Sequence, residues 1–208
     1  MPTQPKEPTE PTARSLQKAD RRQRLLRAAA RLFAERGFHG VSIEDLGGAA
    51  GISGPAVYRH FPNKEAVLEA LLVEVSERLL AGGRVQVEAA SDDAEALRRL
   101  VAFHTEFALT EPELISVQGR DLASLGTSAT RHVRRLQREY VEVWVGVLTH
   151  LEPGLSAGEA RTRAHAVFGL LNSTPFSVRS SSPSAPGPAA RSTLERMAVR
   201  ALVEQGTS

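Results

Sequence analysis

The amino-acid sequence predicts an all-α fold, and two observations lead to this expectation. From about residue 20 onward, apolar residues recur at spacings of three and four, which is the period of an amphipathic helix. No segment alternates apolar and polar residues over the length of a strand. The chain has 208 residues, of which 41% are hydrophobic, so it is long enough to build one or two domains with a sizeable core.

The composition excludes several classes of protein. The chain has no cysteine, which rules out disulfides, thiol nucleophiles and cysteine-ligated metals and fits a cytoplasmic location. Its apolar runs are far shorter than the roughly 20 residues that span a bilayer, and the N-terminus carries no apolar signal segment. We therefore expect neither a membrane partner nor secretion.

Two proline-rich segments divide the chain. Proline recurs every third residue at the N-terminus, so residues 1–15 are expected to form a disordered arm. The segment SSSPSAPGPAA, residues 180–190, is expected to form a long loop before a last helix. Between these breaks we expect an N-terminal domain over residues 16–62 and a second helical domain that begins at residue 63 and extends to residue 208.

The first two helices are defined by their apolar stripes and their caps. Residues 21–36 carry apolar residues at helical spacing, and Gly37 supplies a stop after them. Ser42 precedes a second helix, with Asp45 three residues further on as in a capping box, and Gly51 ends this helix. Both helices are therefore expected to be short and well delimited.

A short third helix and a long fourth helix follow. Ser53 is expected to cap the third helix, and Pro55 lies in its first turn. Asn63 caps the fourth helix, whose apolar face continues until Gly82 and Gly83, where we expect the helix to end.

The helices after these glycines are longer on average, and the longest carries a stripe of apolar residues along its whole length. Their starts and ends are predicted from caps, prolines and apolar periodicity. We expect helices that start at Asp92 or Asp93, that run from Pro112 to about Gly119, and that cover residues 130–151, 157–172 and 191–204.

The three short N-terminal helices have the spacing of a helix-turn-helix. The second and third are joined by a tight turn at residues 51–53, and such a unit presents its second short helix to the major groove of DNA. Many helical domains contain a glycine-turned pair without binding DNA, so the spacing alone leaves the function open.

The amino-acid sequence of this region is a more specific signal than the spacing of its helices. The run VSIEDLGGAAGISGPAVYRHFPNKEAVLEALL, residues 41–72, and the preceding AARLFAERGFHG closely resemble the DNA-binding domain of the TetR family of transcription regulators. The resemblance covers about residues 20–75. It implies a homodimeric repressor of a palindromic double-stranded DNA operator, with a helical C-terminal domain that dimerises, binds a small-molecule effector and needs no cofactor.

The resemblance also implies a set of DNA contacts. Phosphate contacts are expected from a hydroxyl and the free backbone amides at the start of the second helix, from polar side chains after the third helix, and from a lysine at the start of the fourth. Base edges are expected to face the N-terminal half of the third helix. The residues expected to contact phosphates are Ser42, Tyr58, His60 and Lys64. The residues expected to face the bases are Ser53, Gly54, Pro55 and Ala56, and Arg59 can reach either a phosphate or a base.

Two departures from the family pattern bear on this interface. Gly54 lies where many members carry a polar or basic residue, which leaves Pro55 and Ala56 to make apolar contacts with thymine methyl groups. Gly47 and Gly48 are expected to loosen the second helix. The operator sequence is therefore not predicted.

Positive charge is concentrated near the N-terminus. Residues 14–36 hold eight basic and two acidic residues, and Arg14 and Lys18 can add phosphate or groove contacts. A solvated helix face also accounts for such an excess without DNA.

An effector site in the C-terminal domain is implied by the family resemblance, and packing of the core accounts equally well for the same aromatic residues. A basic stripe at Arg131, Arg134, Arg135 and Arg138 is either a solvated face paired with Glu139 and Glu142 or a site for a phosphorylated ligand such as an acyl-CoA. The candidate effector-binding residues are Phe103, Phe107, Tyr140, Trp144, Phe168 and Asn172.

Other polar and small residues have two interpretations each. The polar residues His104, Arg120, Asp121, His165 and Asn172 either orient a ligand or are exposed. A face of small residues on the helix over 157–172 suits close packing in a homodimer. This face consists of Ala164, Ala166, Gly169 and Leu170.

Catalysis and metal binding are not expected. The six histidines lack metal-ligand spacing, and the sequence contains no catalytic triad, carboxylate pair or cofactor loop. Two alternatives to a regulator remain: a helical enzyme, and a helical interaction module that no longer reads DNA.

Overall fold

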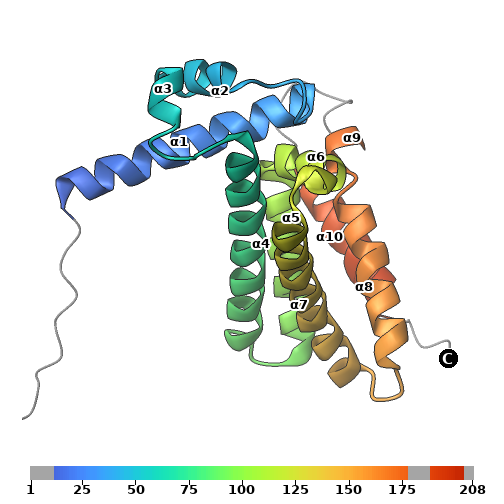
Figure 1. The fold of residues 1–208 in the computed structure, drawn as a ribbon. Helices are drawn as coiled ribbons and strands as arrows, with labels where there is room; N and C mark the ends of the chain where they lie inside the picture. The colour runs from blue at the N-terminus through green and yellow to red at the C-terminus, as the bar shows by residue number, and fades with distance from the viewer. Residues whose placement is uncertain (1–11, 178–187, 204–208) are drawn as a thin grey trace, which may run out of the picture.

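The all-α prediction is confirmed. A computed structural model describes residues 12–177 and 188–203 of the chain, and within these residues it contains helices and connecting turns but no strand. Helices near the N-terminus lie across one end of a bundle formed by the longer helices (Figure 1). The N-terminal helices are α1 (Ala13–Arg36), α2 (Ile43–Ala50) and α3 (Gly54–Val57).

The bundle follows after Phe61. Its long helices bury apolar stripes against one another, and a short helix and a 3₁₀ turn link α5 to α7. The bundle elements are α4 (Lys64–Glu88), α5 (Asp93–Thr110), α6 (Pro112–Asp121), η1 (Leu122–Ser124), α7 (Thr127–Leu151), α8 (Ala157–Leu171), α9 (Thr174–Ser177) and α10 (Pro188–Leu202).

Helix α1 is longer than the apolar periodicity indicated. It begins at Ala13, where the Ser15 N–H donates to the Thr12 hydroxyl at 3.3 Å and so caps the first turn. The expectation of a disordered arm up to residue 15 is therefore wrong for residues 13–15, because a polar cap can start a helix before its apolar stripe begins. The rest of the expected arm, residues 1–11, lies outside the described residues.

The turn between α2 and α3 is formed as the sequence predicts, with one difference. Ser42 and Asp45 make the reciprocal capping box, and Gly51 adopts a left-handed conformation with φ of 69°. Ser53 lies at the start of α3, but its side chain makes no capping hydrogen bond, so that part of the prediction is wrong.

Gly47 has a packing role rather than a loosening one. A Cβ at this position would lie 2.9 Å from the Ile52 carbonyl oxygen, and the Ile52 N–H donates to the Gly47 carbonyl at 2.9 Å. A Cβ on Gly48 meets nothing within 4 Å. The absence of a side chain at Gly47 therefore allows the turn to close against α2.

Helix α4 does not end at the two glycines. It continues to Glu88, with Phe103 against Gly82 and Tyr140 against Gly83, where a Cβ would come within 2.6 Å of the Tyr140 ring. These glycines make room for aromatic rings of α5 and α7, so the expectation of a stop there is wrong.

The core lies between α4, α5, α7, α8 and α10. Trp144, on the apolar stripe of α7, is completely buried, and its neighbours on that stripe are nearly so. Most of the predicted loop over 180–190 lies outside the described residues, while Pro188 already begins α10. Among the described residues, no helix is long and apolar enough to cross a membrane.

Candidate nucleic-acid interface

The outer surface of α3 carries most of the predicted DNA-binding residues. Ser53, Pro55, Tyr58 and Arg59 are exposed on the short α2–α3 unit, which rests on α1 through buried residues such as Val57. Figure 1 shows α2 and α3 on the side of α1 that faces away from the bundle. The unit therefore presents an open face to a large partner.

Tyr58 is the most exposed aromatic residue of this unit. Its side chain is 55% exposed, whereas Phe61, three residues later, is buried in the core. Burying a tyrosine ring is favourable, so an exposed one at the end of α3 points to a binding role rather than to packing.

Ala56 does not lie on the open face. It is 9% exposed and packs toward α1 at the base of a groove between α1 and α3. Little of its surface is left for the predicted contact with bases, which stays a prediction. Gly54 is half-buried beside Glu44, and a Cβ there would make only ordinary contacts at 3.7 Å.

The groove between α1 and α3 is strongly basic. It has a volume of about 600 Å³, and Lys18 and Arg21 of α1 face Arg59 and His60 across it. A positive groove of this kind attracts phosphate groups and gives salt-dependent binding. Sequence reasoning found Lys18 and Arg59 separately, but only the packing of α1 on α3 brings them together.

His60 is held neutral in this groove. Burial lowers the pKa of the imidazole, and the positive charges of Lys18, Arg21 and Arg59 lower it further. Its buried Nδ1 has no hydrogen-bond partner among the described residues. In the protein without DNA, the neutral imidazole is therefore favoured.

Ser42 is already engaged within its own helix cap. Its hydroxyl donates to Asp45 Oδ2 at 2.6 Å, and its backbone N–H donates to the same oxygen at 2.9 Å. These hydrogen bonds lower the pKa of the Asp45 carboxyl. Donation from the hydroxyl to phosphate would compete with this bond, whereas the other predicted phosphate donors, the free backbone N–H groups of the first turn of α2, have no such competitor.

Lys64 has a structural role that the sequence did not indicate. Its Nζ donates to the carbonyl oxygens of Phe38 and Val41, each at 2.8 Å, and lies 4.4 Å from the centre of the Phe38 ring. The ammonium group therefore ties the α1–α2 connection to the start of α4, and the phosphate contact predicted for Lys64 stays a prediction.

Arg120 joins the two parts of the molecule. Its guanidinium donates to the carbonyl oxygens of Phe33 and Ala34 in the last turn of α1, and to both oxygens of Asp121 at 3.0 Å. Asp121 is buried, and its pairing raises the pKa of Arg120. Arg120 is exposed, as one of its two interpretations expects, whereas Asp121 is buried, so exposure is wrong for Asp121. Both side chains are engaged with protein groups rather than free to orient a ligand.

The aromatic residues expected at an effector site pack around His104. The His104 ring packs against both Tyr140 and Phe168, with ring centres 5.8 Å and 4.8 Å away, and Trp144 packs edge-on to it. Phe107 completes the buried group on α5, and Phe103 is half-buried against Gly82.

Two polar contacts hold His104 in this cluster. Its Nδ1 pairs with the Tyr140 hydroxyl at 3.2 Å, and its Nε2 pairs with the Asn172 side-chain oxygen at 3.1 Å. Burial lowers the pKa of His104 to about 4 and raises that of Tyr140, so both groups are neutral near pH 7. The clefts that the described residues form on α1, α3 and α7 do not reach this cluster.

The basic stripe of α7 is a solvent-facing surface, but its acidic partners differ from those expected. Glu139 pairs with Arg84 of α4 at 3.4 Å, and Glu142 pairs with Arg161 of α8 at 2.8 Å. The stripe residues Arg131, Arg134, Arg135 and Arg138 are all exposed.

The face of small residues on α8, which was predicted to suit a homodimer interface, is only partly exposed. Ala166 and Gly169 are exposed, as is His165 beside them, whereas Ala164 is fully buried against the bundle. The prediction is therefore wrong for Ala164, which lies on the inner side of the helix. In the described part of the chain, no three acidic or histidine residues cluster as a metal site.

Comparison with known proteins matches both parts of the chain. The family model described as "Bacterial regulatory proteins, tetR family" matches residues 25–71, and "Tetracyclin repressor-like, C-terminal domain" matches residues 90–176. The chain is 30% identical over 146 residues to the HTH-type transcriptional repressor KstR2 of Rhodococcus jostii, covering 70% of each chain.

Solved structures give the same fold. A TetR-family transcriptional regulator from Bordetella parapertussis superposes with a TM-score of 0.77 at 24% identity, covering 89% of this chain and 95% of that one. AibR, solved with isovaleryl coenzyme A and operator DNA, superposes with a TM-score of 0.70 at 16% identity, covering 86% and 96%. The chain belongs to the TetR family of bacterial transcriptional regulators.

Proposed function

We propose that the protein is a homodimeric repressor that leaves a palindromic operator when a small hydrophobic or acyl-CoA-like effector binds. The observation that carries this proposal is the open α3 face with exposed Tyr58 and Arg59, bordered by the basic groove against α1. Family membership favours this regulator over a helical enzyme.

In this proposal, DNA binding depends on two kinds of contact. Tyr58, Arg59, Lys18 and Arg21 contact phosphates, and this contribution weakens as salt concentration rises. Ser53 and Pro55 face the bases, with few side-chain donors available for direct readout. Specificity would therefore depend strongly on the shape of the operator and on the spacing of two half-sites in a dimer.

The dimer is proposed to form through α8 and α10. The exposed small residues Ala166 and Gly169 allow a second helix to approach closely, and Met197 of α10 is 49% exposed. A twofold axis through such an interface would place two α3 helices on one face of DNA.

The effector is proposed to enter the aromatic cluster around His104. AibR, which has the same fold, was solved with an acyl-CoA, which supports a related ligand here. A ligand would have to separate Phe168 from Tyr140 and Trp144, since their rings are in contact. Such a ligand changes DNA affinity only if it binds the two conformations of the protein unequally.

A promoter–reporter assay tests the direction of regulation. The DNA upstream of the protein's own gene drives the reporter, with the chain or its Tyr58→Ala variant supplied separately. We expect reporter output to fall at least fivefold with the chain and not with the variant. A rise in output would identify an activator and overturn the proposed repressor.

A second candidate function is an interaction module without specific DNA binding. The observation in its favour is the segment Gly54–Ala56, where Gly54 and Pro55 offer no side-chain hydrogen-bond donor and Ala56 is buried. Reporter output unchanged by the chain, together with equal affinity for all DNA sequences, would support this alternative.

A further inference from the structure

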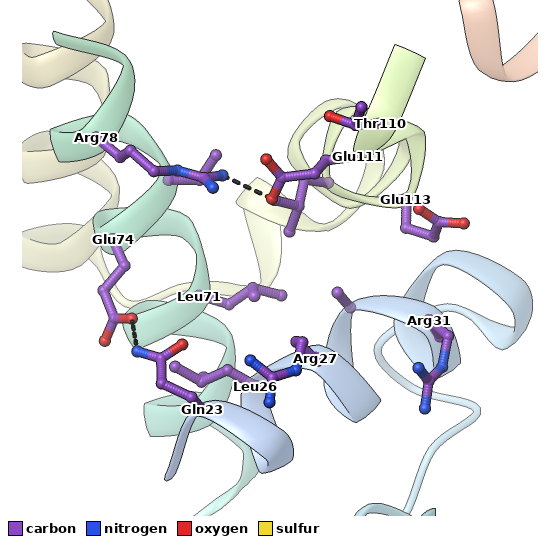
Figure 2. Close-up of a pocket in the computed structure, with 13 residues that line it drawn as sticks. Gln23, Leu26, Arg27, Arg31, Leu71, Glu74, Arg78, Thr110, Glu111 and Glu113 are labelled. Carbon is purple, nitrogen blue, oxygen red and sulfur yellow. Dashed lines mark hydrogen bonds and ion pairs between the residues drawn. The ribbon is translucent and has the colours of Figure 1, made fainter. Parts of the chain in front are cut away.

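A cleft lies where the DNA-binding helices meet the bundle, away from both the α3 face and the aromatic cluster. It has a volume of about 470 Å³, within the range of small-molecule sites, and its walls come from α1, α4 and the start of α6 (Figure 2). Neither the predicted DNA contacts nor the predicted effector residues line it.

The floor of this junction cleft is apolar. Leu26 and Ala30 of α1, Leu71 and Val75 of α4, and Leu114 of α6 line it and keep only a few percent of their surface exposed. An apolar chain or ring placed on this floor would remove further hydrocarbon surface from water, which favours binding.

The charged side chains at the rim of the cleft differ in whether they already have partners within the protein. Arg78 donates to Glu111 at 2.7 Å, and Glu74 accepts from Gln23 at 3.3 Å, as the dashed lines in Figure 2 show. Glu74 also pairs with Arg22. These two carboxylates are therefore already neutralised by protein groups.

Two arginines on the α1 side of the cleft are different. Arg27 and Arg31 are exposed and line the cleft, and within the described residues neither makes a salt bridge or side-chain hydrogen bond. A cleft with an apolar floor and unpaired guanidinium groups at its edge fits an amphipathic anion, since a carboxylate can pair with arginine through two hydrogen bonds.

We propose that the junction cleft binds an amphipathic carboxylate, with its apolar part on Leu26, Leu71 and Leu114 and its carboxylate on Arg27. A ligand placed there contacts α1 and the bundle at once, so its affinity depends on how the two parts are oriented. Occupancy of the cleft therefore changes DNA affinity, and DNA changes ligand affinity by the same factor. This coupling rests on the proposed DNA-binding function, whereas the binding of the carboxylate does not.

Calorimetric titration of the full chain with decanoate tests the site. We expect one decanoate per protomer and at least fivefold weaker binding to the Arg27→Gln variant. Decylammonium, which has the same chain and the opposite charge, is expected to bind at least fivefold more weakly than decanoate. Arg24→Gln is the matched control, because Arg24 lies on the same helix outside the cleft, paired with Asp20 at 2.9 Å, and this variant is expected to bind decanoate normally.

A variant that fills the junction cleft gives a second test of decanoate binding. Ala30→Leu places extra carbons on the floor of the cleft and is expected to abolish decanoate binding, with thermal unfolding used to check that the variant folds. The proposal is overturned if the unmodified chain does not bind decanoate, if Arg27→Gln binds it equally well, or if decylammonium binds as tightly.

The coupling is tested by fluorescence anisotropy of operator DNA with and without saturating decanoate. We expect the DNA affinity to change at least fivefold for the unmodified chain and to stay constant for Arg27→Gln. Unchanged DNA affinity with decanoate bound would overturn the coupling. If the chain bound no DNA at all, the proposed function would fail while calorimetry would still decide whether the cleft binds the carboxylate.

Discussion

Arg120 donates a hydrogen bond to the backbone carbonyl of Ala34 at 3.3 Å, which fixes the end of α6 to the last turn of α1. The same guanidinium reaches the Phe33 carbonyl and is held in place by Asp121. The last carbonyls of a helix lack partners within the helix, so a cation from another element satisfies them and complements the helix dipole.

Replacing Arg120 is therefore expected to loosen the junction. Arg120→Ala leaves the Asp121 carboxylate buried without its cation, and we expect the free energy of unfolding to fall by about 1–3 kcal/mol. Thermal or urea unfolding measures this loss. Arg138→Ala, on the exposed stripe of α7, is the control and should leave stability nearly unchanged; equal effects of the two changes would contradict the bridging role.

The two adjacent glycines of α2 are expected to respond oppositely to alanine. Gly47→Ala brings a Cβ within 2.9 Å of the Ile52 carbonyl and should destabilise the protein by about 1–3 kcal/mol, as overpacking does. Gly48→Ala meets open space and should stabilise it by up to about 1 kcal/mol through helix propensity. Urea unfolding of both variants measures the two changes in the free energy of unfolding. A Gly47→Ala protein as stable as the unmodified chain would contradict the packing role of Gly47 and show that the turn can shift.

Tyr58 and Lys64 are expected to separate DNA binding from folding. Tyr58→Ala removes an exposed ring and should lower DNA affinity about tenfold or more while leaving the melting temperature unchanged. Lys64→Ala removes two hydrogen bonds to backbone carbonyls and should lower stability by about 1–3 kcal/mol. A Lys64→Ala protein that melts normally yet fails to bind DNA would contradict the role of Lys64 in stability and would show that it acts in DNA binding.

Stability is expected to fall below pH 6.5 because of His104. Burial lowers its pKa to about 4 in the folded state from the ordinary 6.5 of an exposed histidine, so the unfolded chain binds a proton that the folded chain excludes. The stabilisation by neutral His104 is complete above pH 6.5 and is progressively lost toward pH 4, with about 2 kcal/mol gone at pH 5. Urea unfolding of the unmodified protein and His104→Gln over this range measures the difference; identical pH profiles would contradict the assignment.

The sequence predicted the local features of the fold well. The caps at Ser42, Asn63 and Asp92 and the left-handed Gly51 are formed as expected, because each depends on neighbouring residues only. Helix α1 begins earlier than its apolar stripe, because the Thr12 cap starts it over polar residues that apolar periodicity does not mark.

Features that depend on distant contacts were not predictable in the same way. Gly82 and Gly83 are interpreted from sequence as helix stops, and only the approach of Phe103 and Tyr140 reveals them as packing sites. Lys64 shows the same limit, since the carbonyls that it contacts lie more than 20 residues earlier in the chain.

The basic groove and the junction cleft are also products of packing. Lys18 and Arg59 lie far apart in sequence and become neighbours only when α3 rests on α1. Their combined positive field is the basis of the proposed DNA interface.

The central claim is that this surface binds a specific DNA sequence. Fluorescence anisotropy of the protein on DNA from upstream of its own gene, against random DNA of equal length over a salt series, tests it most directly. We predict tighter binding to the upstream DNA that persists as salt rises, with one or two dimers per site. Weak binding that is equal for both DNAs and disappears with salt would contradict the claim.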